Sequence, residues 1–156
     1  MQSIETLRFG LVRFDEHEVI EFPAGLPGFE RENRFLLIEP EASLPLKFLQ
    51  SVLNPQLSFV CAPLPLLLPK YEAVLPRADR DLLAMPPEGV APGTVLEWLA
   101  ILCFARPEAP TANLLGPLVI RRDVGLGVQS IREDSRYSAR QPLFSAAPVS
   151  EQLLCS

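Results

Sequence analysis

Apolar and polar residues alternate with a period of two along most of this chain. Successive side chains of a β-strand point to opposite faces, so this period is typical of strands. Gly10 separates the first two runs, which indicates a hairpin or a bent strand. The expected strands are residues 4–9, 11–14, 19–22, 35–39, 46–52, 57–62, 71–75, 94–104, 114–121 and 128–132.

One segment has a helical pattern instead. Residues 77–85 combine apolar and charged side chains, follow Pro76 and end before two further prolines. Proline is accepted in the first turn of a helix and ends one later, so a short helix is expected here. Residues 94–104 are long enough for a second helix, but their β-branched and aromatic side chains favour a strand.

The composition agrees with this reading. Apolar residues make up 48% of the 156 residues, and there are 17 prolines. Proline lacks an N–H donor and interrupts helices, so prolines within an apolar sequence suit short strands joined by rigid loops. We therefore expect one compact, mainly β domain over residues 1–143, with about ten short antiparallel strands and one short helix in a barrel or sandwich. Residues 144–156 are expected to form a flexible C-terminal tail.

Export and membrane insertion are poorly supported. The first ten residues carry charges and lack the apolar core of a signal peptide. The longest apolar stretch, residues 59–69, contains Pro63 and Pro65 and is too short to span a bilayer. The three cysteines are odd in number and widely spaced, which matches neither a disulfide framework nor a zinc site. A cytoplasmic protein with reduced thiols is expected.

Candidate catalytic residues are few. His17 is the one histidine, and no second histidine or suitably spaced cysteine completes a metal site. Cys61 or Cys103 with His17 would form the nucleophile and base of a small hydrolase, but both cysteines lie in apolar runs that favour buried, inert thiols. We expect no enzyme activity, metal or cofactor. A hydrolase using Cys61 or His17 and a purely structural β-domain are the alternatives.

Charge is unevenly distributed along the chain. The first 41 residues contain nine acidic and four basic residues, and the rest contain ten of each, so the net charge of −5 arises near the N-terminus. Direct nucleic-acid binding needs a basic surface, and none is expected here. An acidic surface with Glu16, Glu18 and Glu21 would attract a basic partner protein. Solubility alone is the other explanation for such a surface.

Four short segments carry residues that packing alone does not explain. In the first, Gly25, Pro27 and Gly28 favour a tight loop, because the glycines permit positive φ and proline fixes it. That loop either presents Leu26 and Phe29 or tucks both inward. The other segments are Leu49-Gln50-Ser51, a bent strand over residues 111–120 with Asn113 and Pro117, and a domain end with Gln129, Ser135, Tyr137, Arg140, Pro142 and Leu143.

In this order and at this spacing, the four segments resemble the signature of the FliW family. That family shows a Gly-Leu/Ile-Pro-Gly-Phe loop, a Leu-Gln-Ser strand, a Thr-Ala-Asn-Leu-x-x-Pro-x-Val-Ile strand and a Gln-x-Ile…Ser-x-Tyr-x-x-Arg-x-Pro-Leu ending. The resemblance runs from about residue 4 to residue 143. The chain departs from the pattern at Gln141, where histidine is common, and at Leu126, where lysine is frequent.

The resemblance implies a β-barrel-like protein that acts by binding other proteins. Family members are described as binding newly made flagellin in the cytoplasm. They also bind CsrA, a translational repressor of flagellin mRNA, and relieve its repression. Because flagellin and CsrA use the factor alternately, flagellin synthesis is coupled to export. We expect the same partners here, no membrane association, and a monomer when unbound.

The domain end, residues 129–143, is the first candidate for partner contact, and we call it the C-terminal edge. Tyr137 and Arg140 are residue types that concentrate binding energy in interfaces. They lie in a segment with too few apolar residues to be core, and Gln129 and Leu143 flank them. The alternative is that Tyr137 caps the barrel and Arg140 is solvated.

Overall fold

The computed structural model describes residues 1–133 and 136–144. Within them the strands are β1 (Gln2–Thr6), β2 (Gly10–Phe14), β3 (Ile20–Glu21), β4 (Arg34–Ile38), β5 (Lys47–Ser51), β6 (Ser58–Pro63), β7 (Leu96–Cys103), β8 (Thr111–Ala112), β9 (Leu118–Arg121), β10 (Leu126–Gln129) and β11 (Gln141–Pro142). The helices are α1 (Leu64–Leu67) and α2 (Arg77–Leu82), with 3-10 turns η1 (Glu16–Glu18) and η2 (Glu41–Ser43). The expected tail lies outside the described residues, apart from Phe144.

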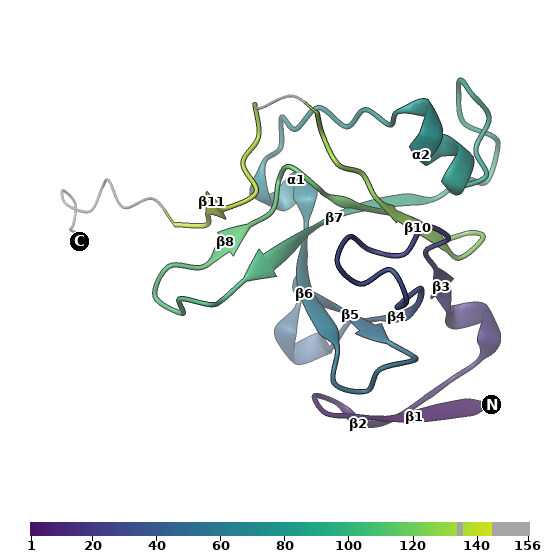
Figure 1. The fold of residues 1–156 in the computed structure, drawn as a ribbon, viewed down its shortest axis with the longest axis vertical. Helices are drawn as coiled ribbons and strands as arrows, with labels where there is room; N and C mark the ends of the chain where they lie inside the picture. Colours follow the sequence, from purple (N-terminus) through teal and green to yellow (C-terminus); the bar gives the residue numbers. More distant parts are fainter. Residues whose placement is uncertain (134–135, 145–156) are drawn as a thin grey trace.

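Seven strands close a barrel in the order β7-β6-β5-β4-β3-β10-β9, and β9 pairs back with β7 (Figure 1). Neighbours run antiparallel, except for a short parallel pairing in which Leu126 of β10 lies opposite Glu21 of β3. The end of β7 leaves this ring and pairs with β8, which pairs with β11. The expected mainly β, barrel-like fold is confirmed.

Both faces of the ring are covered by apolar contacts. Inside the barrel, buried side chains including Phe22, Phe35 and Leu99 form one core cluster. Three further clusters lie on the outer face. Phe14 of the β1–β2 hairpin packs with Leu36. The segment after α2 and the C-terminal segment supply the other two covers, so a short and otherwise unstable helix such as α2 is held by packing.

Several expected elements differ from the structure. The predicted strand 71–75 is wrong, because the backbone groups of Glu72 bond to side chains of Tyr137 and Arg132 instead of to a neighbouring strand. One helix was expected and two are present: α1 follows β6 directly, with Pro65 in its first turn. The strand expected from residue 114 begins at Leu118. The strand expected at 128–132 lies earlier, at Leu126–Gln129.

Polar motif residues organise turns around the ring. The buried Gln50 amide donates to the backbone oxygen of Ser51 at 3.0 Å and approaches those of Asn54 and Pro55. Asn113 Oδ1 accepts the N–H groups of Leu115 and Gly116 at 3.0 and 2.9 Å. This cap explains why the chain leaves β8 at residue 113 and bends before β9.

Pro117 is buried at the end of that bend. Its carbonyl accepts the N–H of Ser130 at 2.8 Å, next to the buried strands β9 and β10. The bent strand expected over residues 111–120 is therefore two strands, β8 and β9, joined by a fixed turn.

The glycine-rich loop joins β3 to β4 and lies within the outline of the ring (Figure 1). Leu26 is 1% exposed and belongs to the inner core, whereas Phe29 is 42% exposed and meets Phe59 edge-on. Gly25 and Gly28 have φ of +69° and +85°. At Gly25 a Cβ atom would also lie 2.6 Å from the backbone oxygen of Glu30.

These two glycines give a matched pair of tests. Gly28→Ala should lower the free energy of unfolding by about 1–2 kcal/mol, because only the positive φ opposes a side chain there. Gly25→Ala should cost more, since the added methyl also meets the Glu30 backbone. Urea unfolding measures both. Equal losses in the two variants would contradict the close approach at Gly25.

Candidate protein-binding surface at the C-terminal edge

β8 and β11 carry the sheet beyond the ring at the C-terminal edge (Figure 1). A hollow of about 280 Å³ lies there, and we call it the leucine hollow. Its apolar lining consists of Leu67, Leu68, Ala112, Leu114, Tyr137, Pro142 and Leu143. Arg136 and Gln141 also line it, so Gln141, one of the two departures from the family pattern, lies in this hollow.

Tyr137, which lines the leucine hollow, is stacked on Tyr71. The rings of Tyr71 and Tyr137 lie 4.2 Å apart with an interplanar angle of 26°. Tyr71 donates its hydroxyl to the Leu114 carbonyl at 2.7 Å, and Tyr137 accepts the N–H of Glu72 at 3.0 Å. The stack therefore ties the irregular segment after α1 to the C-terminal edge.

Two arginines, Arg132 and Arg136, contact the rings of this stack. The Arg132 guanidinium lies 5.3 Å from the Tyr71 ring centroid and 5.2 Å from that of Tyr137. Arg132 also donates to the Glu72 carbonyl at 2.6 Å, and Arg136 forms an ion pair with the Glu72 carboxylate. Guanidinium–aromatic contacts of this kind are attractive, most of all when partly desolvated.

Two further depressions lie next to the stack and the end of the sheet. One, the valine hollow, has a volume of about 360 Å³ and is lined by Val74, Pro76, Ile131, Arg132 and Glu133. The other, the arginine hollow, has a volume of about 250 Å³ and is lined by Cys103, Ala105, Arg106, Ala109, Thr111 and Arg140. Residues of the C-terminal edge thus contribute to three hollows, each of which is lined by both apolar and arginine side chains.

The structure brings together three of the four residues expected at this edge. Tyr137 and Leu143 line the leucine hollow, and the exposed Arg140 lines the arginine hollow. Gln129 instead donates its side-chain amide to the Gly116 carbonyl at 2.8 Å and supports the bend before β9. Ser135 lies outside the described residues.

The three expected acidic residues lie around η1 and β3. Glu16 pairs with Arg34 at 2.7 Å, and hydrogen bonds from Gln2 and then Arg34 lower the pKa of this exposed carboxyl group. Glu18 accepts the N–H of Asp15 at 2.8 Å and caps η1. Glu21 is exposed on β3. Glu16 is therefore already paired with a cation, whereas Glu18 and Glu21 are the better candidates to attract a basic partner.

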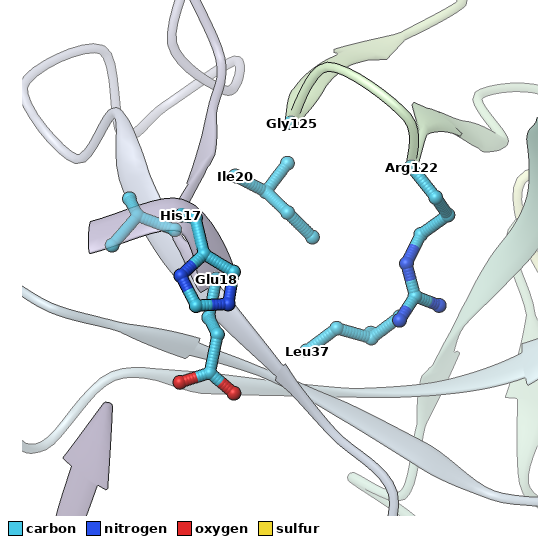
Figure 2. A pocket seen from close by; sticks show the side chains of 7 residues that line it. His17, Glu18, Ile20, Leu37, Arg122 and Gly125 are labelled. Carbon is cyan, nitrogen blue, oxygen red and sulfur yellow. The ribbon is translucent and has the colours of Figure 1, made fainter. Parts of the chain in front are cut away.

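His17 lines a polar hollow of about 220 Å³ beside this acidic segment. Figure 2 shows His17 and Glu18 on one side and Arg122 on the other, with Ile20 and Leu37 between them. The Arg122 guanidinium already bonds Glu97 at 2.6 Å. Among residues 1–133 and 136–144, no group of three or more His, Cys, Asp or Glu side chains is placed to hold a metal ion.

Glu97 is the centre of a small ionic cluster on the barrel wall. Its carboxylate receives hydrogen bonds from Lys47 and Arg122, and Lys47 also pairs with Glu39 at 3.2 Å. Burial alone would raise the pKa of Glu97, but the hydrogen bonds from Lys47 and Arg122 outweigh it and the pKa is lowered. The charged form of Glu97 is therefore favoured by folding.

Cys61 and Cys103, the two cysteines in the described part of the chain, differ in exposure. Cys61 is buried in the inner core, and this burial raises its pKa to about 12. A thiol with such a pKa is hardly ionised at neutral pH, which argues against it as a nucleophile. The expectation that Cys103 is buried is wrong: it ends β7 beyond the ring closure, and its side chain is exposed.

Some residues of the surface were absent from the sequence-based prediction. The sequence pattern places Tyr71 and Arg132 only in expected strands, and it predicts no role for the leucines after β6. The chain contains two tyrosines, and both lie in this stack. Their rarity was the one available signal, because the stacking joins positions that are 66 residues apart in the sequence.

The fold defines the class of small, closed, mainly β barrel proteins. A family model described as FliW protein matches residues 3–143, and the chain belongs to the FliW family. A flagellar assembly factor FliW from Syntrophomonas wolfei is 34% identical over 97% of this chain and 94% of its own length. One from Desulfitobacterium hafniense strain Y51 is 35% identical, with 96% and 95% covered. A crystal structure of the flagellar assembly factor FliW superposes with a TM-score of 0.82 at 30% identity and covers 92% of this chain and 98% of that one.

No helix in the described part of the chain is both long enough and apolar enough to cross a membrane.

The Glu97 cluster predicts a pH dependence of stability. Because folding lowers the pKa of Glu97 below its ordinary value of 4.5, its contribution is complete above that pH and is lost as the pH falls through the lower, folded-state pKa. Glu97→Gln should lower the free energy of unfolding at pH 7 by about 1–2 kcal/mol. The gap between variant and wild type should shrink below pH 4.5.

Urea unfolding at a series of pH values measures this gap. Glu108→Gln is the matched control, since the Glu108–Arg106 pair is largely exposed and contributes little. A gap that stays constant down to pH 3 would show that Glu97 is not stabilised in its charged form.

The tyrosine stack predicts that Tyr137 and Arg140 differ in their effect on stability. Tyr137→Ala removes a ring contact, packing on the outer cluster and a hydrogen bond, and should cost about 2–3 kcal/mol. Arg140→Ala, at an exposed position, should change stability by less than about 0.5 kcal/mol. Thermal unfolding compares the two. An unchanged Tm in Tyr137→Ala would mean that the stack holds nothing in place.

Proposed function

We propose that this chain is a flagellar assembly factor that binds flagellin in the cytoplasm and also binds CsrA. Binding CsrA relieves repression of flagellin mRNA, so that flagellin synthesis follows flagellin export. The observation that carries this proposal is the match to the FliW family over residues 3–143, with relatives described as flagellar assembly factors aligned over nearly their whole length.

The geometry supports a role in protein binding. Apolar and arginine side chains line the hollows at the C-terminal edge, and hydrogen bonds hold these side chains in place, so little rearrangement is needed on binding. Tyrosine and arginine are the residue types that most often dominate interface energies. The C-terminal edge is therefore our first candidate for partner contact, through Arg140, Leu143 and the half-buried Tyr137.

The acidic segment is the second candidate surface. Glu18 and Glu21 are exposed. The strand that ends at Glu21, β3, lies on the other side of the molecule from β8 and β11 (Figure 1). Exposed charges of one sign speed the encounter with a partner of opposite charge more than they strengthen the final complex. A regulator that binds RNA is such a partner, since RNA binding needs a basic surface.

The enzyme alternative has less support from the structure. Its nucleophile would be Cys61, which is buried, or a residue activated by His17, which lies on the surface at η1. A purely structural β-domain would bind neither partner. Binding measurements therefore separate the three functions.

Isothermal titration of the full chain with flagellin and, separately, with CsrA tests the proposal. We expect a saturable, roughly 1:1 binding isotherm with each partner and loss of CsrA binding when flagellin is present in excess. An absence of heat change and of complex by size-exclusion chromatography with both partners would contradict the proposed function.

The acidic segment predicts an effect on association rate. Glu18→Gln with Glu21→Gln should slow association with CsrA about threefold or more at low salt, with a smaller effect at high salt. Glutamine retains the acceptor that caps η1, so the fold is preserved. Glu88→Gln with Glu108→Gln is the control, because it removes the same charge from exposed sites outside the first 41 residues. Stopped-flow fluorescence measures both, and equal slowing by the control would show that only net charge matters.

A further inference from the structure

We propose that the three hollows of the C-terminal edge receive a partner segment in which apolar side chains are flanked by acidic residues. This inference rests on the proposed function and adds the chemistry of the segment that the edge recognises. The three hollows are linked by shared elements. Tyr137 lines the leucine hollow, Arg132 stacks on Tyr137 and lines the valine hollow, and β8 contributes to both the leucine and the arginine hollows.

The size and lining of the hollows favour side chains of a peptide over a small-molecule ligand. Two of their volumes, about 280 and 250 Å³, lie below the roughly 300–1,000 Å³ of small-molecule sites, and the third, about 360 Å³, lies near its lower end. Large apolar side chains are exposed here: Val74 and Ile131, which line the valine hollow, are 61% and 49% exposed, and Phe144, which follows Leu143, is 72% exposed. Exposed apolar side chains that gather in one region are typical of a protein interaction site.

The walls are fixed before any partner arrives. Besides the tyrosine hydroxyl bonds, Leu114 donates its N–H to the Ser138 carbonyl at 2.9 Å, and Leu143 donates to the Pro110 carbonyl at 3.1 Å. These bonds join the C-terminal segment to the loops around β8. A preformed surface loses little conformational entropy on binding, so a short segment is enough to dock.

Charge selects the kind of segment. Four of the charged residues that line the three hollows are arginines, and one is a glutamate: Arg106, Arg132, Arg136, Arg140 and Glu133. Arg136 and Arg106 take part in exposed ion pairs with Glu72 and Glu108. Such exposed pairs are weak, and a guanidinium has five N–H donors, so Arg106 can also bond a partner carboxylate. An acidic segment therefore matches this edge, although the chain as a whole is acidic.

Two synthetic peptides test the chemistry directly. Both peptides are about fourteen residues long and contain the same leucine and isoleucine residues. Glutamates flank these residues in the acidic peptide, and lysines flank them in the basic peptide. Fluorescence anisotropy measures their binding to the full-length chain, alongside full-length flagellin and CsrA. We expect the acidic peptide to bind with a Kd below about 1 mM and the basic peptide to bind at least tenfold more weakly.

Two variants locate the site. Gln141→Trp places a large side chain at an exposed position that lines the leucine hollow, and Arg140→Glu reverses a charge in the arginine hollow. Each should weaken binding of the acidic peptide about tenfold or more. The controls are Gln56→Trp in the turn between β5 and β6 and Arg13→Glu on β2, both exposed and on other elements. All four variants are first checked for an unchanged Tm.

The outcomes separate this inference from the proposed function. Flagellin or CsrA binding that is unaffected by Gln141→Trp and Arg140→Glu, together with no selective binding of the acidic peptide, would overturn the inference and leave the proposed function standing. Selective, variant-sensitive binding of the acidic peptide without binding of flagellin or CsrA would support the inference and remove the proposed function. Equal loss in the controls, or no peptide binding by the wild type, overturns the inference.

Discussion

Closure of the ring by β7 is the constraint on which the rest of the structure depends. This strand of eight residues pairs with β9 over Leu96–Leu99 and with β6 over Leu99–Ile101, and its last two residues continue to β8. The same strand therefore seals the barrel and starts the extension that carries the C-terminal edge. Its inward side chains enter the core, and its outward ones, such as Ala100 and Leu102, lie beneath the C-terminal segment. Any change in its register would disturb the core and the proposed binding surface together.

Whether a strand is covered on one face or on both decides how well the alternation of apolar and polar residues predicts it. Strands with one covered face, such as β2, show a clear period of two, and they were placed within a few residues. Residues 94–104 are apolar on both faces because both faces are covered, so only their β-branched and aromatic content distinguished strand from helix. The short helix after Pro76 was predictable from its flanking prolines. The segment at Tyr71 was not predictable, since its backbone bonds to side chains that are distant in the sequence.

The candidate surface was predictable only in part. The sequence predicts Tyr137, Arg140 and Leu143 as candidate contact residues. In the structure all three line the hollows of the C-terminal edge. Their roles differ in a way that the sequence does not reveal: Tyr137 is held by Tyr71 and Glu72, whereas Arg140 is exposed. Gln129 is part of the same family motif, yet its amide supports the bend at Gly116. A motif thus mixes residues whose contacts build the fold, such as Gln129, with residues that stay exposed, such as Arg140, and only the structure separates the two kinds.

We propose that a partner protein docks on the C-terminal edge and on residues 64–76, whose Tyr71 is stacked on Tyr137. Hydrogen exchange of the full chain, measured by mass spectrometry with and without flagellin, tests this claim most directly. We expect flagellin to slow exchange in residues 64–76 and 136–143, with little change in the strands at the opposite side of the ring. Protection confined to the first 41 residues, or no protection in a complex shown to form, would exclude docking at the C-terminal edge.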